Sequence, residues 1–140
     1  MSSPEHSHFA WKARVYWEDT DGGGIVYYAN YLKFLERART EWLRSFGHAQ
    51  SHLIRDAGIA FAVASVNIDY RKPARLDDEL TITCAAGRIG GTTVTFTQKI
   101  YRGTPDDLVA EAQVRVVCID TRTMRPKRLP AFLTQEMLTS

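Results

Sequence analysis

The sequence predicts an α+β domain in which an antiparallel sheet wraps around one long central helix. Residues 31–46 carry apolar side chains at helical spacings of three and four, and several other segments alternate apolar and polar residues as strands do. A sheet with one apolar face must cover that face, and a helix with a wide apolar stripe provides the cover. The 140 residues suit one domain. We expect residues 9–140 to form it, after a flexible N-terminus at residues 1–8.

The N-terminal half is typical of a strand, a glycine-rich turn and the long helix. Residues 8–17 alternate with period two and have one largely apolar face. Residues 18–24, EDTDGGG, end this strand, because three consecutive glycines permit positive φ and disfavour extended structure. Capping preferences place the N-cap of the long helix at Asn30. A second, shorter helix is expected over residues 49–56 and stops at Gly58.

Four further strands are expected in the C-terminal half. In residues 61–70 the alternation changes phase near Ser65, which indicates a β-bulge. Regular alternation continues in three later segments, residues 80–86, 94–100 and 110–118. Glycine-containing turn signals separate these segments. Residues after Pro130 suit a short terminal helix.

Composition and charge exclude several classes of function. The net charge of +2 is small and its basic residues are dispersed, so we expect no nucleic-acid partner. No apolar stretch approaches the roughly 20 residues of a membrane helix, and the N-terminus lacks signal-peptide order, so a cytoplasmic location is expected. Cys84 and Cys118 lack metal-ligand spacing and are expected to be buried, reduced thiols. His48 and His52 are interpreted as solvated, and no metal is expected.

The segment 18–31 is the densest concentration of chemically useful residues. The sequence contains no phosphate-binding loop, dinucleotide fingerprint or serine-nucleophile motif. Asp21 follows a strand, and the chain enters the long helix seven residues later. A helix N-terminus offers free N–H groups, so a facing carboxylate can act as nucleophile or base opposite an oxyanion donor. Turn formation explains the same residues equally well, because Asp before Gly is common in turns.

Residues 15–32, VYWEDTDGGGIVYYANYL, strongly resemble the 4-hydroxybenzoyl-CoA thioesterase family of hotdog proteins. The most similar branch is the bacterial acyl-CoA thioesterases associated with the Tol-Pal system. Shorter matches follow at residues 36–41 (ERARTE), 73–78 (PARLDD), 96–98 (FTQ) and 116–120 (VVCID). The resemblance covers about residues 10–130. It implies a hotdog fold with a five-stranded antiparallel sheet, dimers that pair into homotetramers, and hydrolysis of acyl-CoA without a metal or cofactor.

The resemblance also implies the site residues. Asp21 matches the essential aspartate of the family, and the N–H that polarises the thioester carbonyl matches Tyr28, at a helix start that the family places near that residue. The Tol-Pal branch commonly has histidine at position 28, whereas the 4-hydroxybenzoyl-CoA enzymes have tyrosine, as here. A histidine-dependent step therefore has no residue to perform it.

The phosphates of CoA require basic residues near the site. The candidates for substrate binding are Arg71, Lys72, Arg75 and Arg88. The family places its nucleotide contacts around the hairpin that here contains Arg88. Solvated loop charges explain each of these four residues equally well, because exposed Arg and Lys are the norm.

The expected function is hydrolysis of acyl-CoA thioesters to free acid and CoA, with Asp21 as nucleophile or general base. One alternative is a non-catalytic acyl-CoA-binding hotdog module, which has no use for Asp21. Another is a thioesterase specific for 4-hydroxybenzoyl-CoA. A hotdog hydratase commonly uses histidine, and none occurs between residues 9 and 47. The acyl group stays open between aromatic and aliphatic.

Overall fold

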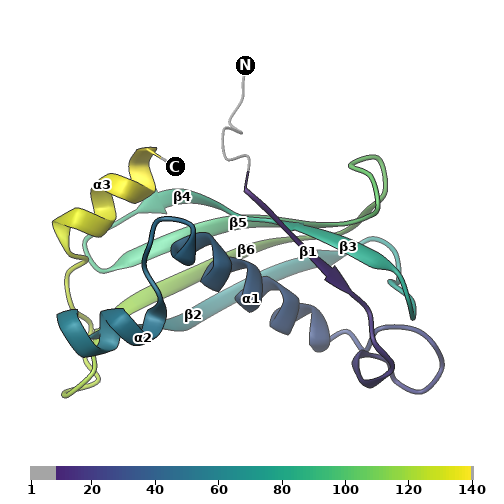
Figure 1. The fold of residues 1–140 in the computed structure, drawn as a ribbon, viewed down its shortest axis with the longest axis horizontal. Helices are drawn as coiled ribbons and strands as arrows, with labels where there is room; N and C mark the ends of the chain where they lie inside the picture. Colours follow the sequence, from purple (N-terminus) through teal and green to yellow (C-terminus); the bar gives the residue numbers. More distant parts are fainter. Residues whose placement is uncertain (1–8, 140) are drawn as a thin grey trace.

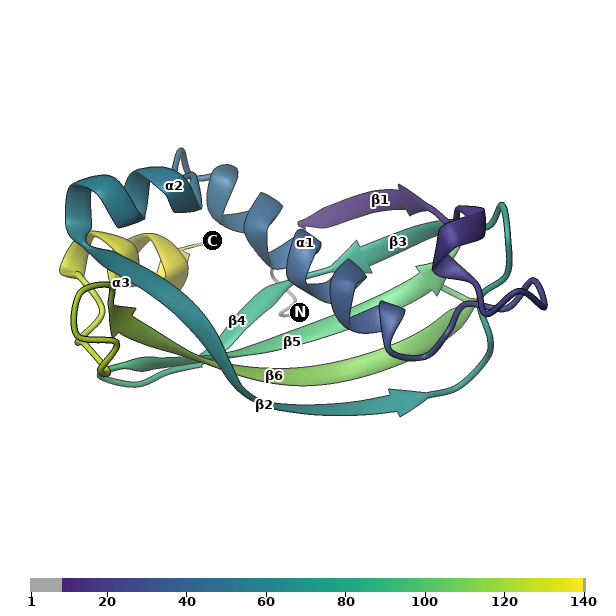
Figure 2. The same cartoon turned by 90° about the horizontal axis from the view of Figure 1, so that it is seen from below.

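Helix α1, Asn30–Arg44, runs along the concave face of one curved antiparallel sheet (Figures 1 and 2). The structure is a computed structural model and describes residues 9–139. The expected flexible segment 1–8 lies outside the described residues. The arrangement confirms the predicted α+β class, because a single long helix packs against a single sheet.

The sheet has the strand order β1-β3-β5-β6-β2, with β4 paired to β5, and the pairings are antiparallel. The strands are β1 Ala10–Arg14, β2 Ile59–Tyr70, β3 Glu79–Thr83, β4 Ala85–Ile89, β5 Thr93–Arg102 and β6 Leu108–Asp120. The expected five strands become six because Cys84 separates β3 from β4. The β4–β5 register then shifts around Gly87, where an added Cβ would lie 3.2 Å from the Thr95 carbonyl oxygen. The expected strand over residues 80–86 is therefore divided at Cys84 into β3 and the start of β4.

The core lies between α1 and the sheet. The inward face of α1 is buried as its spacing predicts, at Tyr31, Phe34, Leu35, Ala38, Trp42 and Leu43. Trp42 meets Phe96 of β5 edge-on, with ring centroids 5.2 Å apart. Cys84 and Cys118 are buried free thiols, as expected. No helix among residues 9–139 is long and apolar enough to cross a membrane.

Strand β2 forms one edge of the sheet. Its pairing with β6 shifts register between Val63 and Ser65, which confirms the predicted bulge. The bulge keeps Val63 and Val66 opposite buried residues of β6, although they are three residues apart. Both stay exposed, at 50% and 37%, because β2 has no neighbouring strand on this side among residues 9–139.

The structure corrects the ends of several elements. Helix α1 begins at Asn30 with Ala29 as N-cap, and the Asn30 side chain donates to the Asp19 carbonyl, so Asn30 is not the N-cap. Strand β1 ends at Arg14, because a 3₁₀ turn, Trp17–Asp19, follows. The short helix α2, Gln50–His52, continues as a π-helical turn, Leu53–Ala57, and stops at Gly58, which has a φ of +65°.

Helix α3, Ala131–Thr139, packs on the end of the sheet that carries the β4–β5 turn (Figure 1). Leu133 and Met137 are its buried residues. The His48 ring forms a hydrogen bond with the Glu136 carboxylate of this helix, so the expectation that His48 is simply solvated is wrong. His52 is exposed.

Candidate active site

Asp21 lies at the start of a tight chain reversal. Thr20 and Val26 form an antiparallel bridge, and the Asp21 N–H donates to the Ile25 carbonyl at 3.0 Å. Gly22 and Gly24 have φ values of +89° and +84°, which residues with a side chain rarely adopt. The three-glycine tract therefore lets the chain turn back immediately after Asp21.

The Asp21 carboxylate is exposed and held by its own turn. Its Oδ1 accepts a hydrogen bond from the Gly23 N–H at 2.8 Å. One carboxylate oxygen is thus oriented by the backbone, and the other has no hydrogen-bond partner among residues 9–139. Such a carboxylate is positioned without being neutralised by a neighbouring cation.

Hydrogen bonds from the segment after β2 connect the turn that contains Asp21 to helix α1. The Val26 N–H donates to the Ala74 carbonyl at 2.8 Å, and the Leu76 N–H donates to the Gly24 carbonyl at 2.9 Å. The Ala74 N–H in turn donates to the buried Tyr31 Oη at 2.9 Å. Burial raises the pKa of the Tyr31 phenol, so this hydroxyl stays neutral and keeps its proton as a donor.

The start of α1 presents free backbone donors. The Asn30 N–H donates to Tyr27 and the Tyr31 N–H to Tyr28, which closes the first turn of the helix. The N–H groups of Tyr28 and Ala29 have no acceptor within the part of the chain that the structure describes. Free N–H groups at a helix N-terminus stabilise a developing negative charge.

One cavity of about 510 Å³ brings Asp21 and Tyr28 together. Its lining also contains Ile25, Val26, Tyr27, Tyr31, Tyr70, Arg71, Lys72 and Pro73. The cavity therefore holds a carboxylate, a helix start with free donors and a largely aromatic wall. An acyl carbonyl placed at the helix start would have the carboxylate in the same cavity.

Three tyrosines of the aromatic wall, Tyr27, Tyr31 and Tyr70, were not among the predicted site residues. The Tyr70 ring lies 5.3 Å from that of Tyr31 and 6.2 Å from that of Tyr28, and the Tyr70 hydroxyl donates to the Tyr28 carbonyl at 3.2 Å. Burial is the main cause that raises the pKa of Tyr70, so it too is neutral. The alternation of β2, continued through the bulge at Ser65, places Tyr70 on the inward face and was the signal available for it.

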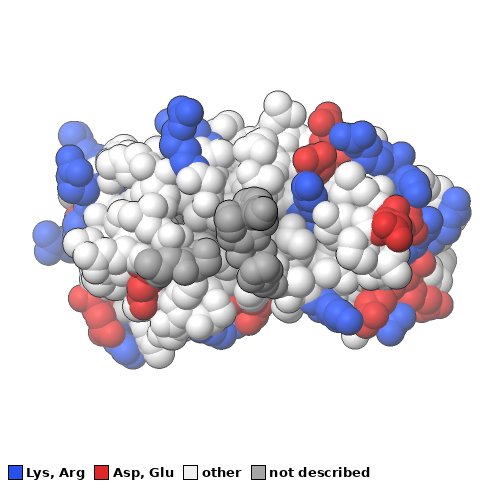
Figure 3. All heavy atoms as spheres, turned by 90° about the horizontal axis from the view of Figure 1, so that it is seen from above, with Lys and Arg blue, Asp and Glu red and all other residues white. Residues whose placement is uncertain are grey.

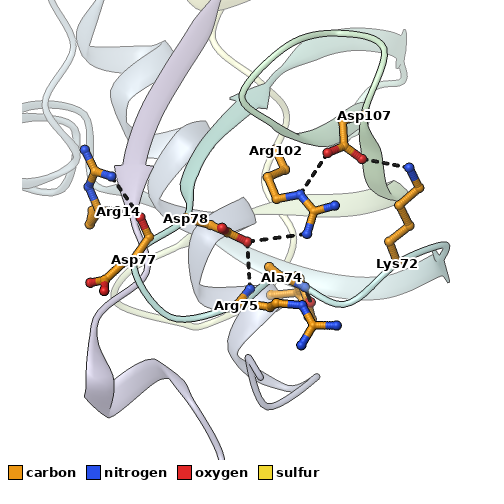
Figure 4. Close-up of polar contacts among 9 residues, drawn as sticks. Arg14, Lys72, Ala74, Arg75, Asp77, Asp78, Arg102 and Asp107 are labelled. Atoms are coloured by element: carbon orange, nitrogen blue, oxygen red, sulfur yellow. Dashed lines mark hydrogen bonds and ion pairs between the residues drawn. The ribbon is translucent and has the colours of Figure 1, made fainter. Parts of the chain in front are cut away.

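Two of the four predicted CoA-binding residues, Arg71 and Lys72, line the cavity. Both make ion pairs: Arg71 with Glu111 at 3.3 Å, and Lys72 with Asp107 at 2.8 Å. Figure 4 shows Lys72 and Arg102 converging on Asp107. These cations are already partly neutralised by protein carboxylates.

Arg75 and Arg88 are arranged differently. The Arg75 backbone N–H is bonded to Asp78 at 2.8 Å (Figure 4), but its guanidinium makes no ion pair with any described residue. Arg88 belongs to β4, which runs toward α3, whereas the turn that contains Asp21 lies at the opposite end of the molecule (Figure 1). Figure 3 shows Lys and Arg at both ends of one face, interspersed with Asp and Glu. Within one chain, Arg88 is therefore not brought to the cavity.

Comparisons with known proteins agree with this geometry. The thioesterase superfamily profile matches residues 23–109. The acyl-CoA thioester hydrolase YbgC of Escherichia coli O6:H1 is 44% identical over 128 residues, which cover 91% of this chain and 94% of YbgC. The long-chain acyl-CoA thioesterase FadM of Escherichia coli K12 is 37% identical over 112 residues, with coverage of 78% and 81%.

Solved structures give the same result. A probable thioesterase from Bartonella henselae has a TM-score of 0.80 at 35% identity, over 87% of this chain and 98% of that one. Slr0204, a 1,4-dihydroxy-2-naphthoyl-CoA thioesterase from Synechocystis, has a TM-score of 0.84 at 25% identity, over 93% and 95%. The superfamily match spans more than half of the chain, and the relatives span nearly all of it. With its sheet wrapped around α1, this chain is a hotdog-fold protein that belongs to the thioesterase superfamily.

Proposed function

We propose that the chain hydrolyses acyl-CoA thioesters to a free acid and CoA. The observation that carries the proposal is the shared cavity, in which a turn-oriented carboxylate and a helix start with unbonded N–H groups lie together. The activity named for the YbgC and FadM relatives supports the same reaction. Because CoA leaves as a thiolate of low basicity, the reaction needs little acid assistance.

The proposed mechanism uses Tyr28 through its backbone and Asp21 through its side chain. The thioester oxygen accepts the Tyr28 N–H, which stabilises the negative charge that develops on it. Asp21 either attacks the carbonyl carbon to give an acyl-enzyme anhydride, or removes a proton from a water molecule that attacks. Both routes release the CoA thiolate; in the first, a water molecule then hydrolyses the anhydride, which frees the carboxylic acid and restores Asp21, and in the second the attacking water gives the acid directly.

The test replaces Asp21 with asparagine and measures the thiol released from a panel of acyl-CoAs. The neutral amide is nearly isosteric but is neither nucleophile nor base, so kcat should fall at least about 10²-fold. Glu18→Gln is the matched control, because Glu18 is an exposed acid in the preceding turn, and it should retain full activity. An Asp21→Asn variant with more than about a tenth of the wild-type kcat would contradict the assignment.

The same panel separates the alternatives. A protein that binds acyl-CoA by calorimetry but releases no thiol is the non-catalytic binding module. Activity confined to 4-hydroxybenzoyl-CoA identifies the specific aromatic thioesterase.

The proposal assigns CoA phosphate binding to the four basic residues Arg71, Lys72, Arg75 and Arg88. Arg75 is the strongest of these within one chain, because it is exposed, makes no ion pair with a described residue and bridges to Ile25, which lines the cavity. Arg88 would serve the cavity of a second copy. Arg75→Gln should raise KM for acyl-CoA with little change in kcat, since a phosphate contact is remote from the reacting carbonyl.

We also propose that the protein is a homodimer or homotetramer. One edge of the 12-residue strand β2 pairs with no other strand in the part of the chain that the structure describes, and exposed apolar side chains lie on this strand. A bare edge of this length favours pairing with another strand, and a second β2 is self-complementary in an antiparallel arrangement. Light scattering should give an even-numbered oligomer; a monomer at micromolar concentration would contradict the proposal.

A further inference from the structure

Arg39 of α1 is a partly buried cation whose close partner is neutral. Its Nη1 donates to Gln98 Oε1 at 3.1 Å. Gln98 is completely buried and donates from Nε2 to the Leu35 carbonyl at 3.0 Å. The arrangement fixes one edge of the guanidinium from beneath the helix and leaves its other donors available.

No carboxylate among residues 9–139 forms an ion pair with Arg39. Glu36, one turn earlier, acts on Arg39 electrostatically, but its Oε2 accepts the Thr40 hydroxyl at 3.0 Å. Burial raises the pKa of the neighbouring Cys84 thiol, which therefore stays neutral. Burial also lowers the pKa of Arg39 from its usual value. A cation withdrawn from water without a paired anion is unfavourable, so this site favours an anionic ligand.

Arg39 lines two cavities along the seam between α1 and β2. The larger is about 320 Å³, and its apolar lining is Leu32, Leu35, Val63, Val66 and Val114. Lys33 and Glu36 are its other charged residues, so the lining carries one net positive charge. The smaller cavity, about 30 Å³, continues past Arg39. An apolar space in which Arg39 is the one partly buried cation suits a hydrocarbon chain that terminates in an anion.

The larger cavity follows the candidate active site along the same seam. On the helix, Tyr31 lines the active-site cavity and the next residue, Leu32, lines the larger seam cavity. On β2, Tyr70 lines the active-site cavity and Val66, four residues earlier, lines the larger seam cavity. Arg39 lies eleven positions after Tyr28, most of them within α1, which gives an axial distance of about 16 Å at the helical rise. The Arg39 side chain lines the same cavity as Leu32, so the ligand spans less than this backbone distance.

We propose that the acyl chain lies along the α1–β2 seam and that Arg39 binds a carboxylate at its far end. The preferred substrates are then CoA monothioesters of medium-length dicarboxylic acids. This inference rests on the proposed thioesterase function and specifies its substrate class. A two- or three-carbon diacid is too short to reach Arg39 from a carbonyl at Tyr28.

The test compares kcat/KM for three matched pairs of thioesters: hexanoyl- and adipoyl-CoA, octanoyl- and suberoyl-CoA, and decanoyl- and sebacoyl-CoA. The wild-type protein should prefer the diacid in at least one pair by about tenfold or more, because a charge-assisted hydrogen bond discriminates by at least that factor. Arg39→Gln removes the charge but keeps an amide donor for Gln98, so it should fold and lose the preference. Arg39→Lys should keep part of it.

Arg37→Gln is the matched control, because Arg37 is exposed on the same helix and lines neither cavity. It should leave the preference unchanged. Light scattering on Arg39→Gln is measured in parallel. If that variant loses its oligomeric state while selectivity is unchanged, Arg39 serves a second copy of the chain and the inference is wrong.

The kcat/KM values of the wild-type protein on the three pairs test the inference even if no Arg39 variant folds. Equal rates for both members of all three pairs overturn the inference while the thioesterase function stands. Release of no thiol from any acyl-CoA overturns the proposed function itself.

Discussion

Replacing Tyr28 with proline should reduce kcat far more than replacing it with alanine, because only proline removes the backbone N–H. That N–H makes no hydrogen bond to any described residue, so its loss leaves no structural partner unsatisfied. The Tyr28 carbonyl, which accepts from Tyr70 and Tyr31, is retained in both variants. Loss of one oxyanion donor typically reduces kcat by about 10²–10³, or roughly 2.7–4 kcal/mol.

The contribution of the Tyr28 side chain to kcat and to stability is measured with separate variants. Its ring lies 5.0 Å from that of Tyr27 and 6.2 Å from that of Tyr70, contacts that each contribute about 0.5–1.5 kcal/mol to stability. Tyr28→Phe keeps the ring and the N–H, so kcat should change by less than about tenfold, or 1.4 kcal/mol. Tyr28→Ala removes the ring alone and is the reference for the proline variant.

The assay is single-turnover and steady-state thiol release on the best acyl-CoA, with circular dichroism and thermal melting to confirm that each variant folds. Tyr28 precedes α1 and its N–H makes no hydrogen bond to a described residue, so proline removes no structural hydrogen bond there and a folded Tyr28→Pro variant is expected. A loss above about a hundredfold in Tyr28→Phe would refute the reasoning and assign the role to the hydroxyl. Equal activity in the proline and alanine variants would refute the backbone donor.

Three further variants test the supports of the site and the fold. Gly24→Ala places a side chain at a φ of +84° and should cost about 1–2 kcal/mol in the free energy of unfolding by urea, with a parallel loss of kcat. Met124→Gly should stabilise the protein by about 0.5–1 kcal/mol, because Met124 is 66% exposed at a φ of +62° and glycine relieves that strain at a smaller entropic cost. Tyr31→Phe leaves the Ala74 N–H without its acceptor and should lose about 1–3 kcal/mol at pH 7. Burial raises the pKa of Tyr31 above its unfolded value near 10, so its stabilisation is complete below about pH 10 and is lost as pH rises further; urea melts at pH 7 and pH 11 should show a smaller alkaline loss for Tyr31→Phe than for the wild type.

Local patterns predicted the elements whose cause is local. The phase change at Ser65 located the β2 bulge, because a bulge shifts which residues face inward and leaves a direct mark on the alternation. The interruption at Cys84 left no such mark, since the residues on both sides alternate normally. The shift at Gly87 involves the Thr95 carbonyl on another strand, which no local pattern reveals.

The same distinction applies to side chains. Capping statistics placed Asn30 at the N-cap, but its amide is used by the Asp19 carbonyl eleven residues away, and the helix start shifts accordingly. His48 was interpreted as solvated because its partner, Glu136, is 88 residues distant. Asp21 and Tyr28 line one cavity, and the resemblance of this segment to a known family had identified both as candidate site residues. Tyr70 reaches that cavity only through the β2–β6 pairing.

The strand order also determines when the cavity can exist during synthesis. Strand β2, Ile59–Tyr70, does not pair with any of the next three strands of the sequence. It pairs with β6, Leu108–Asp120. A nascent chain that has emerged only as far as β5 therefore lacks the template that holds Tyr70 and the following residues in place. Closing this long loop is slow, so β2 should dock late, and translation of β6 becomes the step that commits the chain to its final shape. Ribosome-bound chains arrested before residue 108 should consequently bind no acyl-CoA, although Asp21 and the whole of α1 have already been made.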